Sequence, residues 1–121
     1  MADNYGPVTA LSAAVATANS AALDLRNYIT KTIEITTASS FDGTVDIQGS
    51  LDGTNFVNCR YAPLGDTSAL GYVIAQLTYT NNATRLFYTV TDYWPYMRFV
   101  MTRTDGNITI KLHAISEGAS A

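Results

Sequence analysis

Residues 29–56, ITKTIEITTASSFDGTVDIQGSLDGTNF, contain the patterns that decide the fold class. Over 29–37, three isoleucines and Lys31 alternate with threonines and Glu34, and this period of two predicts a strand. Apolar and polar residues alternate again over 45–50, just before Asp52-Gly53, a dipeptide that accepts positive φ in a tight hairpin turn. The stretch therefore predicts antiparallel strands joined by short turns.

The same alternation recurs along the rest of the chain. Further strands are expected at 56–61, 70–80, 85–91, 96–103 and 108–115. Turns are expected at 39–43, 62–66, 81–82 and 105–106, where glycine, proline, asparagine and aspartate gather. Seven or eight strands at this spacing predict an all-β fold, an antiparallel β-sandwich or jelly roll.

Residues 1–22 differ from this body, because eight of them are alanine and their apolar residues do not alternate. Helical spacing of Leu11, Val15 and Ala18 favours a short helix, whereas Gly6-Pro7 favours an extended arm, which we prefer. We therefore divide the chain into an N-terminal arm or short helix, 1–22, and a β-sandwich domain, 23–121. Four side chains of the arm are expected to contact a neighbouring subunit: Tyr5, Val8, Leu11 and Val15.

Composition limits the possible partners. Seven basic and ten acidic side chains give a net charge of −3, which argues against nucleic-acid binding. Charged residues make up 14% of the chain, against about 25% in an average protein. A surface with so few charges favours a subunit of an assembly, so we expect a homo-oligomer, with a trimer as first choice. No apolar run of 18 residues and no basic leader occur, so we expect neither a membrane anchor nor a secretory signal.

Residues with catalytic or metal-binding chemistry are few, and we expect no enzyme, no cofactor and no metal site. His113 falls in a predicted strand without a nucleophile near it in sequence. Cys59 lies in the predicted strand 56–61, where a buried thiol is expected. The adjacent Arg60 would favour a thiolate if both side chains were exposed. Four aspartates carry oxygen ligands suitable for calcium but lack the spacing of a calcium loop: Asp42, Asp46, Asp52 and Asp66.

One aromatic cluster, Tyr93-Trp94-Pro95-Tyr96, allows two interpretations. Aromatic rings on a loop stack on sugar rings in carbohydrate-binding proteins, with Asp92 and Arg98 nearby to bind hydroxyl groups. The alternative, which we prefer, is that the rings close one end of the sandwich or pack against a neighbouring subunit. The cluster adds three candidate partner-binding residues: Tyr93, Trp94 and Tyr96.

A family resemblance rests on the hairpin QGSLDGTNF at 48–56, the strand YMRFV at 96–100 and the closing I-x-I-x-L strand at 108–112. These segments resemble the small β-sandwich proteins of tailed-bacteriophage virions, many of which carry an S-x-DGTNW-like hairpin. Phe56 stands where that hairpin usually has tryptophan, and we expect it to be a core ring. Carbohydrate-binding sandwiches of the discoidin type have a similar hairpin.

The resemblance implies a structural protein located in the virion. Within that class we expect a capsid cement or decoration protein that stabilises the capsid lattice through contacts with its own copies and with the major capsid protein or another virion protein. The alternative is a carbohydrate-binding β-sandwich module of a phage tail or adhesin.

Overall fold

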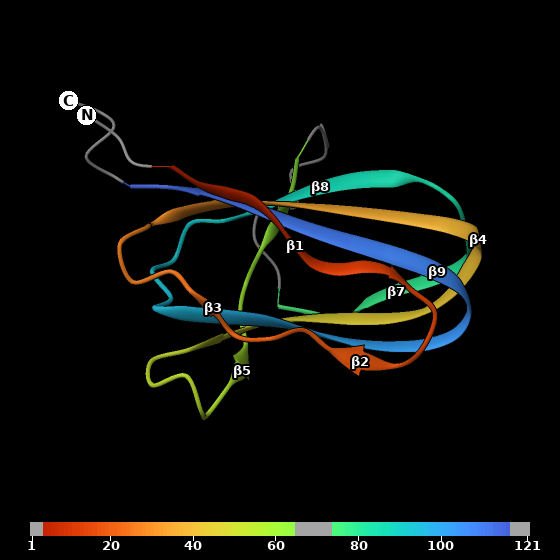
Figure 1. Cartoon of the computed structure of the whole chain (residues 1–121), viewed down its shortest axis with the longest axis horizontal. Coiled ribbons are helices and arrows are strands. Elements are labelled where there is room, and N and C mark those ends of the chain that lie inside the picture. The colour runs from red at the N-terminus through yellow and green to blue at the C-terminus, as the bar shows by residue number, and fades with distance from the viewer. Residues whose placement is uncertain (1–3, 65–73, 117–121) are drawn as a thin grey trace.

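The structure, a computed structural model, describes residues 4–64 and 74–116, and within them the chain is all β (Figure 1). One antiparallel sheet contains every described strand, and no described residue belongs to a helix, so none forms a membrane-crossing helix. The strands are β1 (Asn4–Ala14), β2 (Ala18–Asn19), β3 (Leu23–Asp24), β4 (Thr30–Ser50), β5 (Val57–Asn58), β6 (Ala62–Pro63), β7 (Leu77–Asn82), β8 (Arg85–Val90) and β9 (Tyr96–Ile115).

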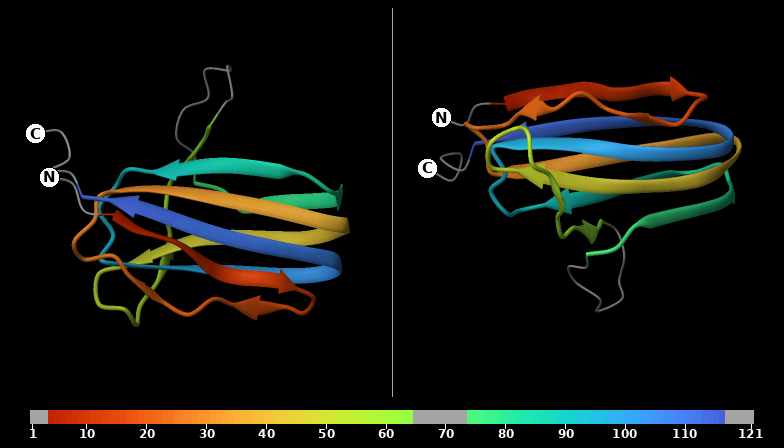
Figure 2. Two further views of the ribbon diagram at one scale, coloured as in Figure 1. Left: turned by 45° about the horizontal axis from the view of Figure 1, so that its top comes forward. Right: turned by 90° about the horizontal axis from the view of Figure 1, so that it is seen from below.

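Two long strands make this sheet into a sandwich. β4 and β9 pair with each other from Thr30↔Ile115 to Ser50↔Tyr96, and both bend midway, so that the sheet folds over on itself (Figure 2). The first half of β4 lies in one layer with β8, the second half of β9 and β1. The second half of β4 lies in the other layer with β7, β5 and the first half of β9. The predicted all-β antiparallel sandwich is confirmed.

We call this bend the corner. Two turns predicted at its position are wrong. Residues 39–43 and 105–106 were expected to separate strands, but β4 and β9 continue through them. Positive φ at Ser39, Ser40 and Gly106 shows how the backbone turns there, and the β4–β9 register shifts between Ala38 and Gly43. A residue with positive φ makes a bulge instead of a hairpin when the neighbouring strand bends alongside it. Each long strand therefore joins two of the predicted strands.

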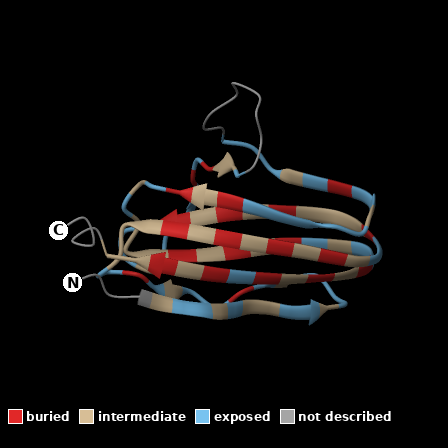
Figure 3. Ribbon diagram, turned by 90° about the horizontal axis from the view of Figure 1, so that it is seen from above, coloured by how far each residue is buried: buried red, intermediate tan, exposed pale blue. Residues whose placement is uncertain are grey.

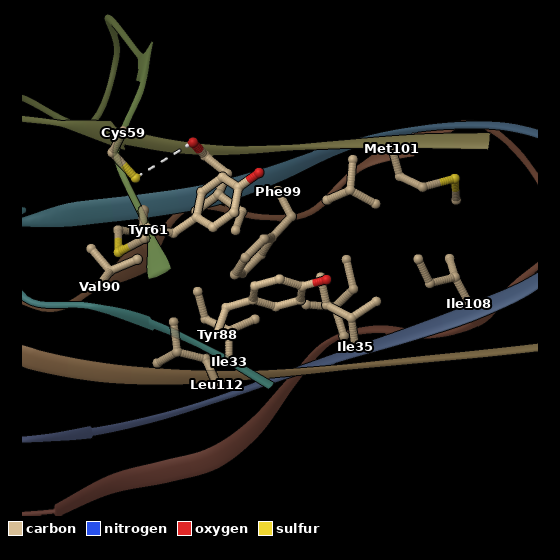
Figure 4. Close-up of a cluster of buried hydrophobic side chains, with 14 of the residues drawn as sticks. Ile33, Ile35, Cys59, Tyr61, Tyr88, Val90, Phe99, Met101, Ile108 and Leu112 are labelled. Atoms are coloured by element: carbon tan, nitrogen blue, oxygen red, sulfur yellow. Dashed lines mark hydrogen bonds between the residues drawn. The ribbon is translucent and has the colours of Figure 1, made fainter. Parts of the chain in front are cut away.

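The core lies between the two layers. Inward side chains alternate with outward ones along β4 and β9, as the banding in Figure 3 shows. In β9 the buried positions are odd-numbered before the corner and even-numbered after it, because the bulge at Gly106 shifts the alternation by one residue. Figure 4 shows Ile33 and Leu112 of one layer near Phe99 of the other. Each such buried side chain contributes about 1.5–3 kcal/mol to stability.

The N-terminal segment 1–22, which we call the leader, packs along the chain's own sandwich in its described part. β1 extends the sheet along the second half of β9, from Asn4↔Ile115 to Ala14↔Ile108, and β2 lies along the first half. Of the two forms considered for 1–22, the short helix is wrong for the described residues, because their backbone is extended and pairs with β9. An unpaired edge of β9 would leave its N–H and C=O groups free, and β1 satisfies them.

Part of the sequence prediction falls outside the described residues. Residues 65–73 include the last two residues of the predicted 62–66 turn, one of the four aspartates (Asp66) and the start of the predicted 70–80 strand. On the described side, β6 lies at 62–63, where a turn was expected, and pairs with β8. The end of the predicted 70–80 strand corresponds to β7, which begins at Leu77.

Candidate functional site

Three loops meet at the end of the sandwich opposite the corner, and we call this the loop end (Figures 1 and 2). They join β3 to β4, β4 to β5, and β8 to β9, with residues 25–29, 51–56 and 91–95. The third loop contains most of the aromatic cluster 93–96. The second contains most of the hairpin QGSLDGTNF at 48–56, which we call the virion-like hairpin because of the resemblance described above. The structure brings both to the same end of the molecule.

The first loop is anchored by a buried leucine. Leu25 is fully buried, and its backbone N–H donates to the carbonyl of Pro95 at 2.7 Å. The flanking Asp24 and Arg26 are exposed and form a bidentate ion pair, in which Arg26 Nε and Nη2 donate to the Asp24 carboxylate at 2.9 and 2.7 Å. These hydrogen bonds lower the pKa of Asp24 below its usual range. The loop therefore presents a fixed, ionised acid–base pair to solvent.

Two tyrosines of the aromatic cluster hold Arg26 in place. Tyr93 Oη donates to the backbone carbonyl of Arg26 at 2.8 Å. The Arg26 guanidinium lies over the Tyr96 ring, 5.8 Å from its centroid, within reach of a cation–π interaction. The sequence prediction singled out both tyrosines but not Asp24 or Arg26, because no local motif distinguishes this pair from other surface charges.

A hollow of about 430 Å³ opens beside this pair and includes a residue of the leader. Its lining is Tyr5, Asp24, Arg26, Asn27 and Tyr28. The rings of Tyr5 and Tyr28 lie 5.3 Å apart at 38° and form an aromatic wall. We call this the tyrosine hollow. It forms because β1 places Tyr5 opposite Ala114, at the end of β9 that reaches the loop end.

The other leader residues predicted to bind a partner have different surroundings. Val8 and Leu11 are partly buried on β1 and pack against the chain's own core. Val15 is 62% exposed where the chain passes from β1 to β2, at the other end of the sandwich from Tyr5. The structure therefore separates the four leader residues, and of these Tyr5 lies at the loop end, where its ring contacts Tyr28.

Trp94 belongs to a second hollow. Its indole ring lies directly on Gly49, where an added Cβ would collide with the ring, so one face of the indole is covered. Its Nε1 is buried without a hydrogen-bond partner among the described residues. The hollow beside it measures about 340 Å³ and has a mainly apolar surface that includes Leu51, 75% exposed, and Val57, 56% exposed. We call this the tryptophan hollow.

The virion-like hairpin forms one wall of the tryptophan hollow and is stiffened by its own side chains. Ser50 Oγ accepts from the N–H of Gly53 at 2.9 Å, and Asp52 Oδ1 accepts from the N–H of Thr54 at 2.9 Å and of Asn55 at 2.8 Å. These backbone donors lower the pKa of Asp52 far below its usual range. The S-x-D-G-T-N residues therefore form a loop closed by its own hydrogen bonds, with Leu51 exposed at the tryptophan hollow.

Phe56, expected as a core ring, is only half-buried and lies outside the core. The Arg98 guanidinium lies 4.2 Å from the centroid of its ring, and Arg98 Nε also donates to Gln48 Oε1 at 2.9 Å. The expectation failed because the 51–56 loop leaves the sheet before Phe56 and turns this ring toward an arginine instead of into the sandwich.

The two side chains expected to bind sugar hydroxyls beside the aromatic cluster are engaged within the protein. Asp92 accepts from Arg60 Nε at 2.6 Å and from Arg60 Nη2 at 2.8 Å, and Arg98 is held by Phe56 and Gln48 as described. The carbonyl of Asp92 also accepts from Lys31 Nζ. Asp92 and Arg98 thus support the loop.

Lys31 is a buried charge that ties the core to the loop end. It points into the sandwich, is fully buried, and donates through Nζ to the carbonyls of Ile29, at 2.6 Å, and Asp92. Burial lowers its pKa to about 8, since removing an ammonium group from water disfavours the charged form. The alternation over 29–37 places Lys31 on the same face as the isoleucines, but no motif in the sequence indicated its contacts with the loop end.

The residues considered for chemistry lie on different faces. Cys59 is buried between the layers, its Sγ donates to the carbonyl of Ile47 at 3.4 Å, and burial raises its pKa to about 12, so the thiol stays protonated. His113 is half-buried and lies opposite Thr32 on an outward position of β9, between two buried residues. Among the described residues, no three histidine, cysteine, aspartate or glutamate side chains gather closely enough to hold a metal ion.

Comparison with known proteins yields structural neighbours only. No family model matches the sequence, and no curated protein sequence matches it. The structure is similar to that of the SPBc2 prophage-derived protein YomS, with a TM-score of 0.74, 13% identity and 96% of each chain covered. It is also similar to the PBSX exported protein XepA, with a TM-score of 0.66, 14% identity, and coverage of 96% of this chain and 38% of that chain. At these identities the likeness shows a shared fold.

Proposed function

We propose that this chain is a non-enzymatic structural protein of a tailed-phage virion, and within that class a capsid cement or decoration protein acting as a homo-oligomer. The observation that carries the proposal is the fold match to a prophage-derived protein, which covers 96% of both chains. A match over that length shows that the two chains share one fold over almost their full lengths. The two neighbours named above are both phage-derived.

The second neighbour supports the use of this fold as a building unit. The chain corresponds to 38% of XepA, so the same sandwich forms part of a longer chain there. The virion-like hairpin at 48–56 and the low charge of the sequence, 14% charged residues, agree with a unit that is covered by other proteins. We assign the chain to the virion on these grounds.

The tryptophan hollow offers the contact surface that such a role requires. Leu51 and Val57 are large apolar side chains held at its rim, and the wall behind Leu51 is rigid. Covering each of them with a partner removes apolar surface from water and favours binding by about 1–3 kcal/mol. Small contacts of this kind become strong when a symmetric lattice repeats them. The partner proposed is the major capsid protein.

Cryo-electron microscopy of the source particle tests the location directly. We expect density for the sandwich on the outer capsid surface, at the seams between capsomers, with its loop end toward the shell. Density in the tail, collar or fibre base would contradict the cement assignment while keeping the virion assignment. A mature particle that lacks the protein would contradict both.

Binding to purified shells tests the contact surface. The double variant Leu51→Asp, Val57→Asp places charges at the rim and is expected to reduce shell binding at least tenfold. Leu86→Asp is the matched control, because Leu86 is an exposed leucine on β8, away from the hollow. Equal binding by the double variant and the control would show that the tryptophan hollow is not the contact surface.

A further inference from the structure

The tyrosine hollow has a size and wall chemistry that the proposed structural role does not use. Its volume of about 430 Å³ lies in the range of small-ligand pockets, about 300–1,000 Å³. Tyr5 and Tyr28 present a pair of tilted rings on one side. The face of an aromatic ring can pack against the apolar C–H face of a sugar ring.

The polar side of the hollow is rich in hydrogen-bonding groups but has no net charge. Asp24 and Arg26 neutralise each other through two hydrogen bonds on one side of the guanidinium. The carboxylate oxygens keep further lone pairs, the guanidinium keeps its other N–H groups, and the exposed Asn27 amide carries both a donor and an acceptor. A ligand with neighbouring hydroxyl groups can both donate and accept here. An anion would meet Asp24 as well as Arg26.

These groups are held in position before any ligand arrives. Leu25 fixes the loop from below, Tyr93 Oη binds the carbonyl of Arg26, and the Tyr96 ring lies under the guanidinium. The backbone N–H of Tyr28 donates to the carbonyl of Leu25 at 3.0 Å, which closes the turn that carries Asn27. A preorganised site avoids most of the entropy cost of ordering side chains on binding.

We propose that the tyrosine hollow is a binding site for a neutral carbohydrate, with Tyr5 and Tyr28 stacking on a sugar ring and Asp24, Arg26 and Asn27 binding its hydroxyl groups. This site is distinct from the aromatic loop first considered for sugar binding, because Trp94 is covered by Gly49 on one face and Asp92 and Arg98 are engaged elsewhere. It is also separate from the tryptophan hollow, so it does not depend on the proposed virion role.

A glycan array followed by titration tests the site in the full chain. The array carries neutral oligosaccharides of hexoses, deoxyhexoses and N-acetylhexosamines together with acidic ones, and we expect signals on neutral members. The neutral oligosaccharide with the strongest signal is then titrated and followed by NMR. Arg26→Gln and Asp24→Asn are each expected to weaken its binding at least tenfold. An array without signals, or acidic members bound in preference to neutral ones, would overturn the proposal.

The matched control is Arg85→Gln. Arg85 is also an exposed arginine in an ion pair, with Glu34 at 3.1 Å, but it lies on β8 outside the hollow. We expect this variant to bind the oligosaccharide like the unchanged protein, and circular dichroism to show the same fold for all variants. Equal affinity of Arg26→Gln and Arg85→Gln would place the sugar elsewhere and refute the site. Because the ligand is neutral, raising the salt concentration should leave the affinity unchanged, and a steep salt dependence would also refute it.

Failure of this test and failure of the proposed function are distinguishable. Loss of sugar binding leaves the position of the protein on the particle unaffected, since shell contact is assigned to Leu51 and Val57. Arg26→Gln should therefore still bind shells. Conversely, the double variant at the tryptophan hollow should still bind the oligosaccharide.

Discussion

The corner and the loop end close the two ends of the same sandwich in different ways. At the corner, β4 and β9 bend together, and the space is filled by backbone and by the fully buried Phe41. At the loop end, three separate loops meet, and they are held by side chains such as Asp52, Tyr93 and Lys31 that bond to backbone groups. One end is closed by backbone geometry and the other by side-chain hydrogen bonds.

Because the two ends are closed differently, substitutions at each end are expected to have different effects. A change at the corner must move two strands at once, because there is no free space between their backbones. A change at the loop end alters one loop or one exposed group while the sheet behind it stays in place. We therefore expect substitutions at the corner to affect unfolding and those at the loop end to affect binding.

The largest effect is expected from removing the strand that links the two ends. Deleting residues 1–22 removes β1 and β2. β1 begins at the loop end, where Tyr5 contacts Tyr28, and ends near the corner, where the N–H of Ala13 donates to Thr109 Oγ1 at 2.9 Å. The deletion exposes the edge of β9 and the apolar surface under Val8 and Leu11, so we expect loss of the cooperative thermal transition in circular dichroism. An unchanged transition would show that the leader is a dispensable arm, as the sequence suggested.

A pair of glycine substitutions compares the two ends directly. Gly106 at the corner has φ +74°, and an added Cβ would lie 2.5 Å from Phe41 Cα and 2.7 Å from Phe41 N. Gly53 at the loop end has φ +80°, but the nearest atoms, in the Tyr96 ring, would lie 3.5 Å away. Gly53→Ala should cost about 1 kcal/mol through backbone strain alone, and Gly106→Ala more than about 3 kcal/mol because the clash adds to it. Urea unfolding measures both, and equal costs would contradict the comparison.

The pH dependence of unfolding tests Lys31, the buried charge at the loop end. Its pKa is lowered from 10.5 to about 8, so between these values the unfolded chain binds more protons than the folded one and stability rises with pH. Cys59 acts in the opposite direction, since its pKa is raised from 9.0 to about 12 and the folded form keeps the proton that the unfolded chain loses above pH 9. Burial raises the pKa of Tyr79 as well, which lowers stability once tyrosines of the unfolded chain ionise near pH 10.

The sum of these effects is a narrow optimum. We expect the free energy of unfolding to rise by about 1 kcal/mol between pH 8 and 9, to level off above pH 9, and to fall above pH 10. Lys31→Met should abolish the rise, whereas Cys59→Ala should extend it toward pH 10. Chemical denaturation at intervals of half a pH unit measures the curve. A rise that persists in Lys31→Met would assign it to another group.

The smallest effect is expected for Tyr93→Phe at the loop end. This change removes the bond from Tyr93 Oη to the Arg26 carbonyl, but the residue is 48% exposed, so water replaces the lost donor. The cost in unfolding free energy should be about 0.5 kcal/mol. Differential scanning calorimetry measures it. A loss above about 1.5 kcal/mol would show that the loop end contributes to stability as the corner does.

Two of the three Asp-Gly dipeptides show how far local sequence can go. Asp52-Gly53 forms the predicted hairpin loop between β4 and β5, whereas Asp105-Gly106 forms a bulge within β9. Both of these glycines have positive φ, as the dipeptide predicts, whereas Gly43 of the third Asp-Gly, within β4, does not. The outcome differs because the chain after Gly106 finds β4 still alongside it, bending in the same direction. A distant strand, and not the dipeptide, decides whether the chain reverses.

The candidate site shows the same division. The aromatic cluster at 93–96 was recognisable because four unusual residues are adjacent in sequence. Asp24, Arg26 and Tyr28 carry no such signal, and their importance comes from meeting Tyr5 and Tyr96, which the antiparallel pairing of β1 and β3 with β9 brings to one end. Asp92 and Arg98 were considered as sugar ligands because they lie near the aromatic cluster in sequence, but in the structure both bind other side chains of the protein.

By itself, the sequence determined the all-β class, the inward and outward faces of β4 and β9 and the positive φ of Gly53 and Gly106, because these depend on the pattern of neighbouring residues. Only the tertiary structure decided that β4 and β9 each continue through a predicted turn, that an alanine-rich leader becomes an edge strand, and that Tyr5 joins the loop end. These outcomes depend on pairing between segments up to about a hundred residues apart, and the free energy of such pairing comes from the buried surface and backbone hydrogen bonds that both partners supply together.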